Sequence, residues 1–185
     1  MLAVIVLLLL WLIRRLATRR RFPFVFDAVV QHVCDGDSVW VKSSDGRRLK
    51  LRIAGMDAPE SDQPGGPEAT EILRRLIGGK AVRVKAVAVD DYGRLVSFLQ
   101  VGKSTDVGFE MVRLGAAWPY RRYYHHLTAK QQALYEAAGY DARKNRRGLW
   151  LDVAAEAPWK WRERHRSLWE KFIRWIKRVL RRLFR

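Results

Sequence analysis

Apolar and polar residues alternate with a period of two in the first part of the chain, which is the pattern of half-buried β-strands. The clearest example is residues 48–53, where leucine and isoleucine alternate with three basic residues. Two valine-rich runs between Phe24 and Val41 precede it, separated by a turn at Asp35-Gly36. Two further apolar runs follow, at residues 82–87 and 95–101. The pattern therefore predicts five strands.

Three helices are predicted from residues that begin and end helices. Residues 66–78 start with a glycine and a proline and end at two glycines. Asp106 and Thr128 are suited to cap helices that run to Leu114 and to about Asn145. Five strands with one helix among them and two after them predict an α+β, mainly β fold. We expect a five-stranded Greek-key barrel of the OB type, packed against about three helices, with further helices at the termini. The buried face of the last barrel-packing helix is expected to hold Leu134, Ala137 and Ala138.

Basic residues are concentrated at the two ends of the chain, which changes what its net charge of +17 means. Residues 1–21 hold five arginines and no acid, and residues 160–185 hold eleven lysines and arginines against two glutamates. The 138 residues between them carry a net charge of only +3. The middle is therefore a nearly neutral domain, and the ends suit a polyanionic surface, either membrane or nucleic acid. The single cysteine excludes an intramolecular disulfide and a cysteine-rich zinc site.

The first segment, residues 1–21, is predicted to attach the chain to a membrane by a single apolar anchor. Twelve apolar residues, Leu2 to Ile13, are followed by arginines. A helix of that length spans about 18 Å, against a hydrocarbon core of about 30 Å. The alternatives are a cleaved signal peptide, which would carry its basic residues before the run, and a core helix, which would have a polar stripe. The arginine flank favours a cytoplasmic position for the main domain.

The last segment, residues 163–185, is predicted to form a basic amphipathic helix. Apolar residues recur every three or four positions from Leu168 to Phe184, and lysines and arginines fill the opposite face. We interpret it first as an interfacial helix on anionic lipid. Packing against the main domain or a second copy, and direct contact with nucleic acid, are the alternatives.

Three short segments of the middle domain place charged residues at turns, where they are available for chemistry. The first is Asp35-Gly36-Asp37-Ser38, between two predicted strands. The second runs from Arg52 to Glu60, where a strand ends in a loop, and the third is Asp91-Tyr92-Gly93-Arg94 at the start of a strand. Each segment alone is also consistent with an ordinary turn or a solvated loop.

Together, in this order and on this barrel, the three segments resemble the thermonuclease (staphylococcal nuclease-like) family. The resemblance covers about residues 24–162 and includes Gly148-Leu149-Trp150 and the segment from Pro158 to Arg162. It implies a thermonuclease-like domain over residues 22–162, between the anchor and the basic helix. The fold it implies is an OB barrel with helices, and the activity is Ca²⁺-dependent cleavage of phosphodiesters in DNA and RNA.

The resemblance also implies a calcium site. Asp37 and Asp57 would bind Ca²⁺ through carboxylate oxygens, and the backbone carbonyl of Ala58 would be a third ligand. Asp35 would support these ligands without contacting the ion. The family pattern has threonine at position 58, so this chain keeps the carbonyl but lacks the hydroxyl. Oxygen ligands of this kind suit Ca²⁺.

The catalytic residues implied by the resemblance are Arg52, Glu60 and Arg94. Phosphodiester hydrolysis needs a deprotonated water, a clamp on the phosphate and stabilisation of the charge that develops on it. Glu60 would act as the general base. The two arginines, which stay cationic, would contact the non-bridging oxygens and stabilise the transition state.

Three aromatic residues correspond to nucleotide-contacting positions of the family: Tyr92, Trp118 and Tyr120. Stacking on a base tolerates any sequence, as a non-specific nuclease requires. Trp118 has the alternative of packing at the edge of the barrel.

We therefore expect a monomeric, membrane-associated, calcium-dependent nuclease that cleaves DNA and/or RNA with little sequence preference. One alternative is a catalytically weak nucleic-acid-binding adaptor at the membrane, and another is a membrane scaffold that acts through its termini alone. The presence of Arg52, Glu60 and Arg94 favours the enzyme, whereas Ala58 and Trp118 leave room for the adaptor.

Overall fold

The computed structural model describes residues 22–165 of the chain. The predicted membrane anchor at residues 1–21 lies outside the described residues, as do residues 166–185 of the predicted basic helix. Within residues 22–165, no helix combines the length and the apolar character needed to cross a membrane.

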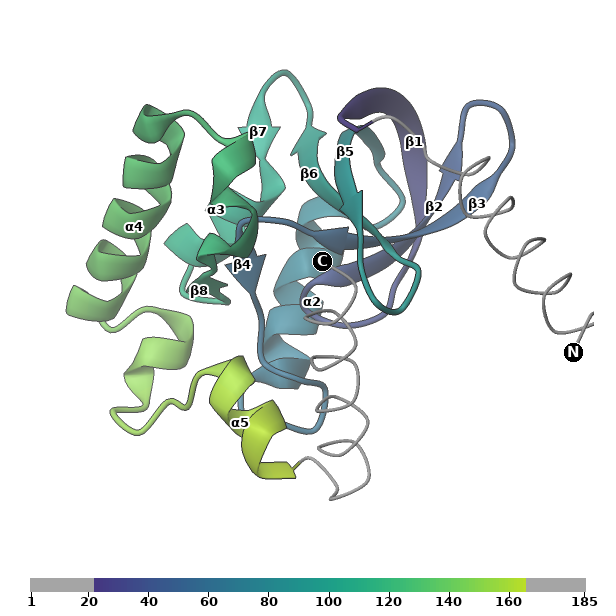
Figure 1. The fold of residues 1–185 in the computed structure, drawn as a ribbon. Coiled ribbons are helices and arrows are strands. Elements are labelled where there is room, and N and C mark those ends of the chain that lie inside the picture. The colour runs from purple at the N-terminus through teal and green to yellow at the C-terminus, as the bar shows by residue number, and fades with distance from the viewer. Residues whose placement is uncertain (1–21, 166–185) are drawn as a thin grey trace, which may run out of the picture.

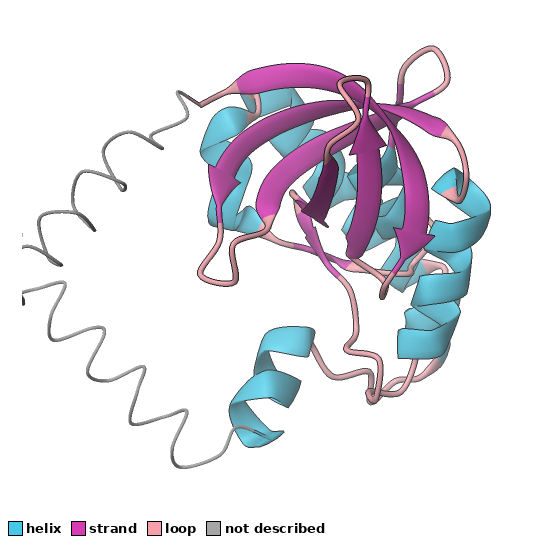
Figure 2. Cartoon of the chain, turned by 90° about the vertical axis from the view of Figure 1, so that its right-hand side faces the viewer, coloured by secondary structure: helices cyan, strands magenta, loops and turns pink. Residues whose placement is uncertain are grey.

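Five strands close into a barrel, as the sequence predicts (Figures 1 and 2). They are β1 (Phe24–Val33), β2 (Ser38–Ser43), β3 (Arg48–Ile53), β5 (Ala81–Val89) and β6 (Leu95–Val101). Neighbours are antiparallel in the order β3-β2-β1-β5-β6, and a parallel pairing of β3 with β6 closes the barrel. The short strand β7 (Thr105–Asp106) extends the sheet beside β6. The strands β4 (Met56–Asp57) and β8 (Trp118–Pro119) form a separate two-stranded sheet.

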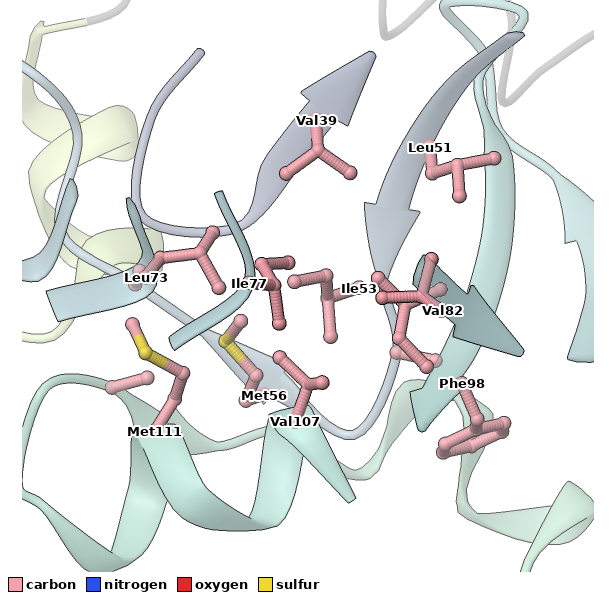
Figure 3. Packing of buried hydrophobic residues seen from close by; sticks show 14 of the residues in the cluster. Val39, Leu51, Ile53, Met56, Leu73, Ile77, Val82, Phe98, Val107 and Met111 are labelled. Atoms are coloured by element: carbon pink, nitrogen blue, oxygen red, sulfur yellow. The ribbon is translucent and has the colours of Figure 1, made fainter. Parts of the chain in front are cut away.

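The barrel is filled by the alternate, inward-facing residues of its strands. Val39 and Val41 of β2 and Leu51 and Ile53 of β3 are fully buried, and each contributes about 1.5–3 kcal/mol on the usual scale for a buried aliphatic side chain. Figure 3 shows how helices complete this core, with Val107 and Met111 below the barrel residues and Leu73 and Ile77 beside them. The helical contributors are Leu73, Ile77, Val107 and Met111.

Three helices pack on the barrel where the sequence predicts them: α2 (Gly66–Ile77), α3 (Val107–Arg113) and α4 (Ala129–Lys144). The predicted caps are present, because the Asp106 carboxylate accepts from the Phe109 N–H and Thr128 forms a reciprocal capping box with Gln131. A fourth helix, α5 (Pro158–His165), crosses the predicted domain boundary after residue 162. Two 3₁₀ segments lie between these helices, at Arg121–His126 and Gly148–Leu151.

The buried face of α4 agrees with the prediction at Ala138 and differs from it at Leu134 and Ala137. Leu134 is 48% exposed and Ala137 is also exposed. The residues turned inward are Tyr135, Ala138, Gly139 and Ala142. Gly139 has a packing role, since a Cβ there would lie 2.5 Å from Cγ of Pro119. The helix therefore approaches β8 more closely than any larger residue would allow.

Tyr135 is the residue that holds the helices to one another. Its ring packs edge-on against Phe109 of α3, and its hydroxyl donates a 2.7 Å hydrogen bond to Oδ1 of Asp106. Burial raises the pKa of Asp106, while this hydrogen bond acts in the opposite direction. One buried side chain thus fixes α4 against the start of α3, next to the end of the barrel that carries the charged segments.

Candidate active site

Arg52 is the centre of a charged network at the end of β3. Its guanidinium donates one hydrogen bond to Oδ2 of Asp37 and another to Oδ1 of Asp57. Asp37 is 6% exposed and Asp57 is fully buried. The alternation of β3 explains this position, because Leu51 and Ile53 face the core and Arg52 between them must face outward. Carboxylates from the β1–β2 turn and from β4 therefore meet on one side chain.

The turn between β1 and β2 presents Asp37 in a fixed orientation. The Asp35 carboxylate accepts the backbone N–H of Asp37 at 3.0 Å, which is a common way to stabilise such a turn. Burial, together with the nearby charges of Asp35 and Asp57, raises the pKa of Asp37 to about 7, although Arg52 and the Ser38 hydroxyl lower it. Burial is the largest of these effects, so the Asp37 carboxylate is less readily ionised than an exposed one.

Arg94 joins the same network through a serine. Nη1 of Arg94 donates to the Ser38 hydroxyl at 2.8 Å, and that hydroxyl donates to Oδ1 of Asp37 at 2.8 Å. Nε of Arg94 donates to Asp90 at 2.7 Å, which anchors the arginine in its hairpin. Tyr92 in that hairpin is 83% exposed, and its ring centroid lies 5.3 Å from the Arg94 guanidinium carbon.

Ser38 is a site residue that the sequence reasoning did not identify. It is fully buried, and its register partner across the β2–β3 ladder is Arg52. The signal that could have found it is strand alternation, which places Ser38 on the outward face beside Arg52.

Glu60 lies at the solvent side of the network and contacts a second unpredicted residue, Arg162 of α5. Nη1 of Arg162 donates to Oε1 of Glu60 at 2.6 Å, and Nη2 donates to Oδ2 of Asp57 at 2.6 Å. The Glu60 side chain is 39% exposed, so it reaches both the buried cluster and water. In Figure 1, α5 lies beside the loop between β4 and α2, which carries Glu60.

The loop that carries Glu60 is held from both sides. The buried side chain of Gln63 accepts the Glu60 backbone N–H at 3.2 Å and donates to the Glu156 carbonyl at 2.6 Å. Gly66, at the start of α2, packs directly on this loop, because a Cβ there would lie 1.9 Å from the Glu60 carbonyl oxygen. The position of Glu60 is therefore set by the fold.

The predicted nucleotide-contacting aromatics have different surroundings. Trp118 is 8% exposed and packs edge-on against Trp150, with ring centroids 5.0 Å apart, as its packing alternative expects. Tyr120 stacks on Trp159 of α5, at 6.0 Å between centroids and 21° between planes. The structure thus brings Tyr120 close to the charged network, leaves Tyr92 at its exposed edge and buries Trp118 beneath it.

The oxygen donors of this cluster fit a hard cation such as calcium. The carboxylates of Asp37 and Asp57 are both buried and converge on one guanidinium, so they are close enough to share an ion. Ala58 follows Asp57 directly and is buried. Across residues 22–165, no group of three or more His, Cys, Asp or Glu side chains is arranged as a metal site. The side chains that contact the Asp57 carboxylate are two arginines, Arg52 and Arg162, and not a third carboxylate.

Comparisons with known proteins agree on one family. Residues 50–152 match the family described as staphylococcal nuclease homologue. The chain is 34% identical over 135 residues to an uncharacterised endonuclease of Escherichia coli, covering 73% of this chain and 84% of that protein. It is 37% identical over 145 residues to micrococcal nuclease of Shigella flexneri, covering 74% and 80%. It is 32% identical over 121 residues to a staphylococcal-like nuclease of Arabidopsis thaliana, covering 65% of this chain and 35% of that protein.

The network predicts that Arg52 stabilises the fold as well as the site. Arg52→Gln leaves the buried carboxylates of Asp37 and Asp57 without their shared cation, so we expect the free energy of unfolding to fall by about 3 kcal/mol. Arg48→Gln is the matched control on the same strand, because Arg48 is exposed and lies over the Trp40 ring, a contact worth at most about 1 kcal/mol. Urea denaturation measures both. Equal losses for the two variants would contradict the stabilising role of Arg52.

Proposed function

Since this chain belongs to the staphylococcal nuclease family, we propose that it is a calcium-dependent nuclease that hydrolyses DNA and/or RNA with little sequence preference. Its nuclease class follows from the family, and calcium dependence and breadth of substrate are the proposed parts. The observation that carries the proposal is a single hydrogen-bonded network. In it Arg52 bridges Asp37 and Asp57, Arg94 reaches Asp37 through Ser38, and Glu60 shares Arg162 with Asp57.

The residues of the network divide the reaction between them. Glu60 reaches solvent, so it is placed to take a proton from an attacking water. Arg52 and Arg94 present guanidinium N–H groups to the non-bridging oxygens of a phosphate and stabilise the charge that builds on them. Calcium, held by Asp37, Asp57 and the Ala58 carbonyl, would supply a Lewis acid and an orienting template.

Nucleic-acid binding without cleavage is the main rival function. Ala58 and the buried Trp118 favour it, because one lacks the hydroxyl of the family pattern and the other packs on Trp150. The exposed ring of Tyr92 and the position of Tyr120 suit base stacking under either function. The proximity of Glu60 to Asp57 favours the enzyme, since a binding module needs no general base.

We also propose that the two terminal segments hold this nuclease on a membrane as a monomer. The support is the sequence pattern, namely the apolar run of residues 2–13 followed by arginines and the basic amphipathic pattern of residues 168–185. The arginine flank supports a cytoplasmic position for the nuclease domain.

Glu60→Gln should lower kcat for plasmid cleavage about 100-fold or more, since an amide cannot take the proton from water. Affinity for an oligonucleotide should stay close to that of the unaltered chain, because the two arginines remain. Glu68→Gln, an exposed carboxylate of α2, is the matched control and should cleave normally. Full cleavage by Glu60→Gln would remove Glu60 from the mechanism.

Asp37→Asn should weaken calcium binding measured by calorimetry, because a neutral amide supplies less charge to the ion than a carboxylate. Asp45→Asn removes the same charge from the exposed β2–β3 turn and should leave calcium binding unchanged. Circular dichroism checks that both variants are folded. Equal calcium affinity in the two variants would place the ion elsewhere.

Deleting residues 1–21 should leave a protein that binds anionic vesicles at low salt and leaves them at about 0.5 M NaCl, where charges are strongly screened. Deleting the basic segment should instead leave a protein that stays on vesicles at high salt, because its attachment then depends on the apolar run of residues 2–13. The second deletion starts at residue 166, so that the described residues of α5, Pro158–His165, are kept. If the protein that lacks residues 1–21 does not bind anionic vesicles at low salt, the basic segment does not bind lipid.

A further inference from the structure

Arg162 contacts the site at the oxygens that a bound cation would need. Nη2 donates to Oδ2 of Asp57 at 2.6 Å, and Nη1 lies 3.3 Å from Oδ1 of the same carboxylate. Nη1 also donates to Glu60 at 2.6 Å. With Arg52 on Oδ1, both oxygens of Asp57 are engaged by guanidinium groups. A divalent cation and Arg162 therefore require the same carboxylate.

The charges place Arg162 and a bound cation in competition for Asp57. Asp57 is fully buried, so a positive ion beside it and a guanidinium on it would repel each other with little screening by water. Arg52 is held by a second carboxylate, Asp37, whereas Arg162 reaches the site from the far end of the described chain. Arg162 is thus the cation that can withdraw when an ion arrives.

The helix that carries Arg162, α5, has few buried contacts with the rest of the protein. Of the eight described residues of α5, Pro158 is buried and the others are at least partly exposed. Trp159, which is 40% exposed, stacks on Tyr120. Few buried apolar contacts hold such an element, so its local opening costs far less than global unfolding.

We propose that Arg162 competes with calcium for Asp57, so that α5 covers the site until the ion displaces it. This inference rests on the calcium dependence proposed above. Displacement releases Glu60 from its ion pair and unstacks Trp159 from Tyr120. The general base and one nucleotide-contacting ring are thereby freed together. The element that covers the site is α5 of the same chain, and calcium, the ion proposed for the reaction, displaces it.

Calcium affinity of the full chain in detergent tests the proposal without reference to activity. We expect Arg162→Gln to bind calcium about tenfold tighter in calorimetry, since the competing unit charge is gone. Arg164→Gln removes the same charge from the same helix, where Arg164 pairs with Glu156 instead, and should change the affinity less than about twofold. Arg162→Lys keeps the charge but cannot donate to Asp57 and Glu60 at the same time through two Nη groups. Its calcium affinity should lie between those of the unaltered chain and Arg162→Gln.

Hydrogen exchange gives a second readout in the unaltered chain. Calcium should speed the exchange of backbone amides in residues 158–165, and should not do so in Asp37→Asn at the same concentration. Calcium affinity that is unchanged or weaker in Arg162→Gln overturns the competition. If that variant instead loses oligonucleotide affinity at unchanged calcium affinity, Arg162 binds substrate and the proposal is also overturned. Absence of calcium binding by the unaltered chain would overturn the calcium dependence itself, which is a separate result.

Discussion

Two carboxylates of like charge lie side by side at the end of the barrel because one guanidinium is placed between them. Arg52 reaches Asp37 and Asp57 only in the observed register of β3, and a shift of one residue would turn Arg52 into the core and Leu51 into water. The hydrophobic interior therefore fixes the geometry of the charged cluster. Every other site residue described here is arranged around this bridge.

Two uncharged side chains hold the charged residues around Arg52 in position by hydrogen bonds. Ser38 links Asp37 to Arg94, and Gln63 links the Glu60 loop to the segment that precedes α5. Both side chains are buried, where a hydrogen bond left unmade costs about 1–3 kcal/mol. The chain thus surrounds its ionic groups with neutral groups that have few alternative partners, which limits the positions that Arg94 and Glu60 can adopt.

The parts of this structure that could be predicted from the sequence are those encoded locally. Alternation gave the strands, capping residues gave three helices, and Arg52, Asp57 and Glu60 lie within nine residues of one another. Arg162 could not be found in this way, because it lies 102 residues from Glu60 and its role depends on how α5 folds back. The inner face of α4 was predicted correctly for Ala138 but wrongly for Leu134 and Ala137, because Tyr135, an amphipathic residue, was not counted as core. Its hydroxyl can be buried because it donates a hydrogen bond to the Asp106 carboxylate.

The range that matches the family description is shorter than the barrel and its charged site, although individual relatives align over 135 to 145 residues. The family match runs from residue 50 to residue 152, yet Asp37 precedes that range and Arg162 follows it. The range also omits β1 and β2, whose removal would leave β3 and β5 as unpaired edges, an arrangement prone to aggregation. Gene fragments, fusions or transplanted domains cut at residues 50 and 152 would therefore carry an open sheet and lack Asp37 and Arg162. A segment that spans residues 22–165 contains all six barrel-sheet strands and all the hydrogen bonds of the charged network.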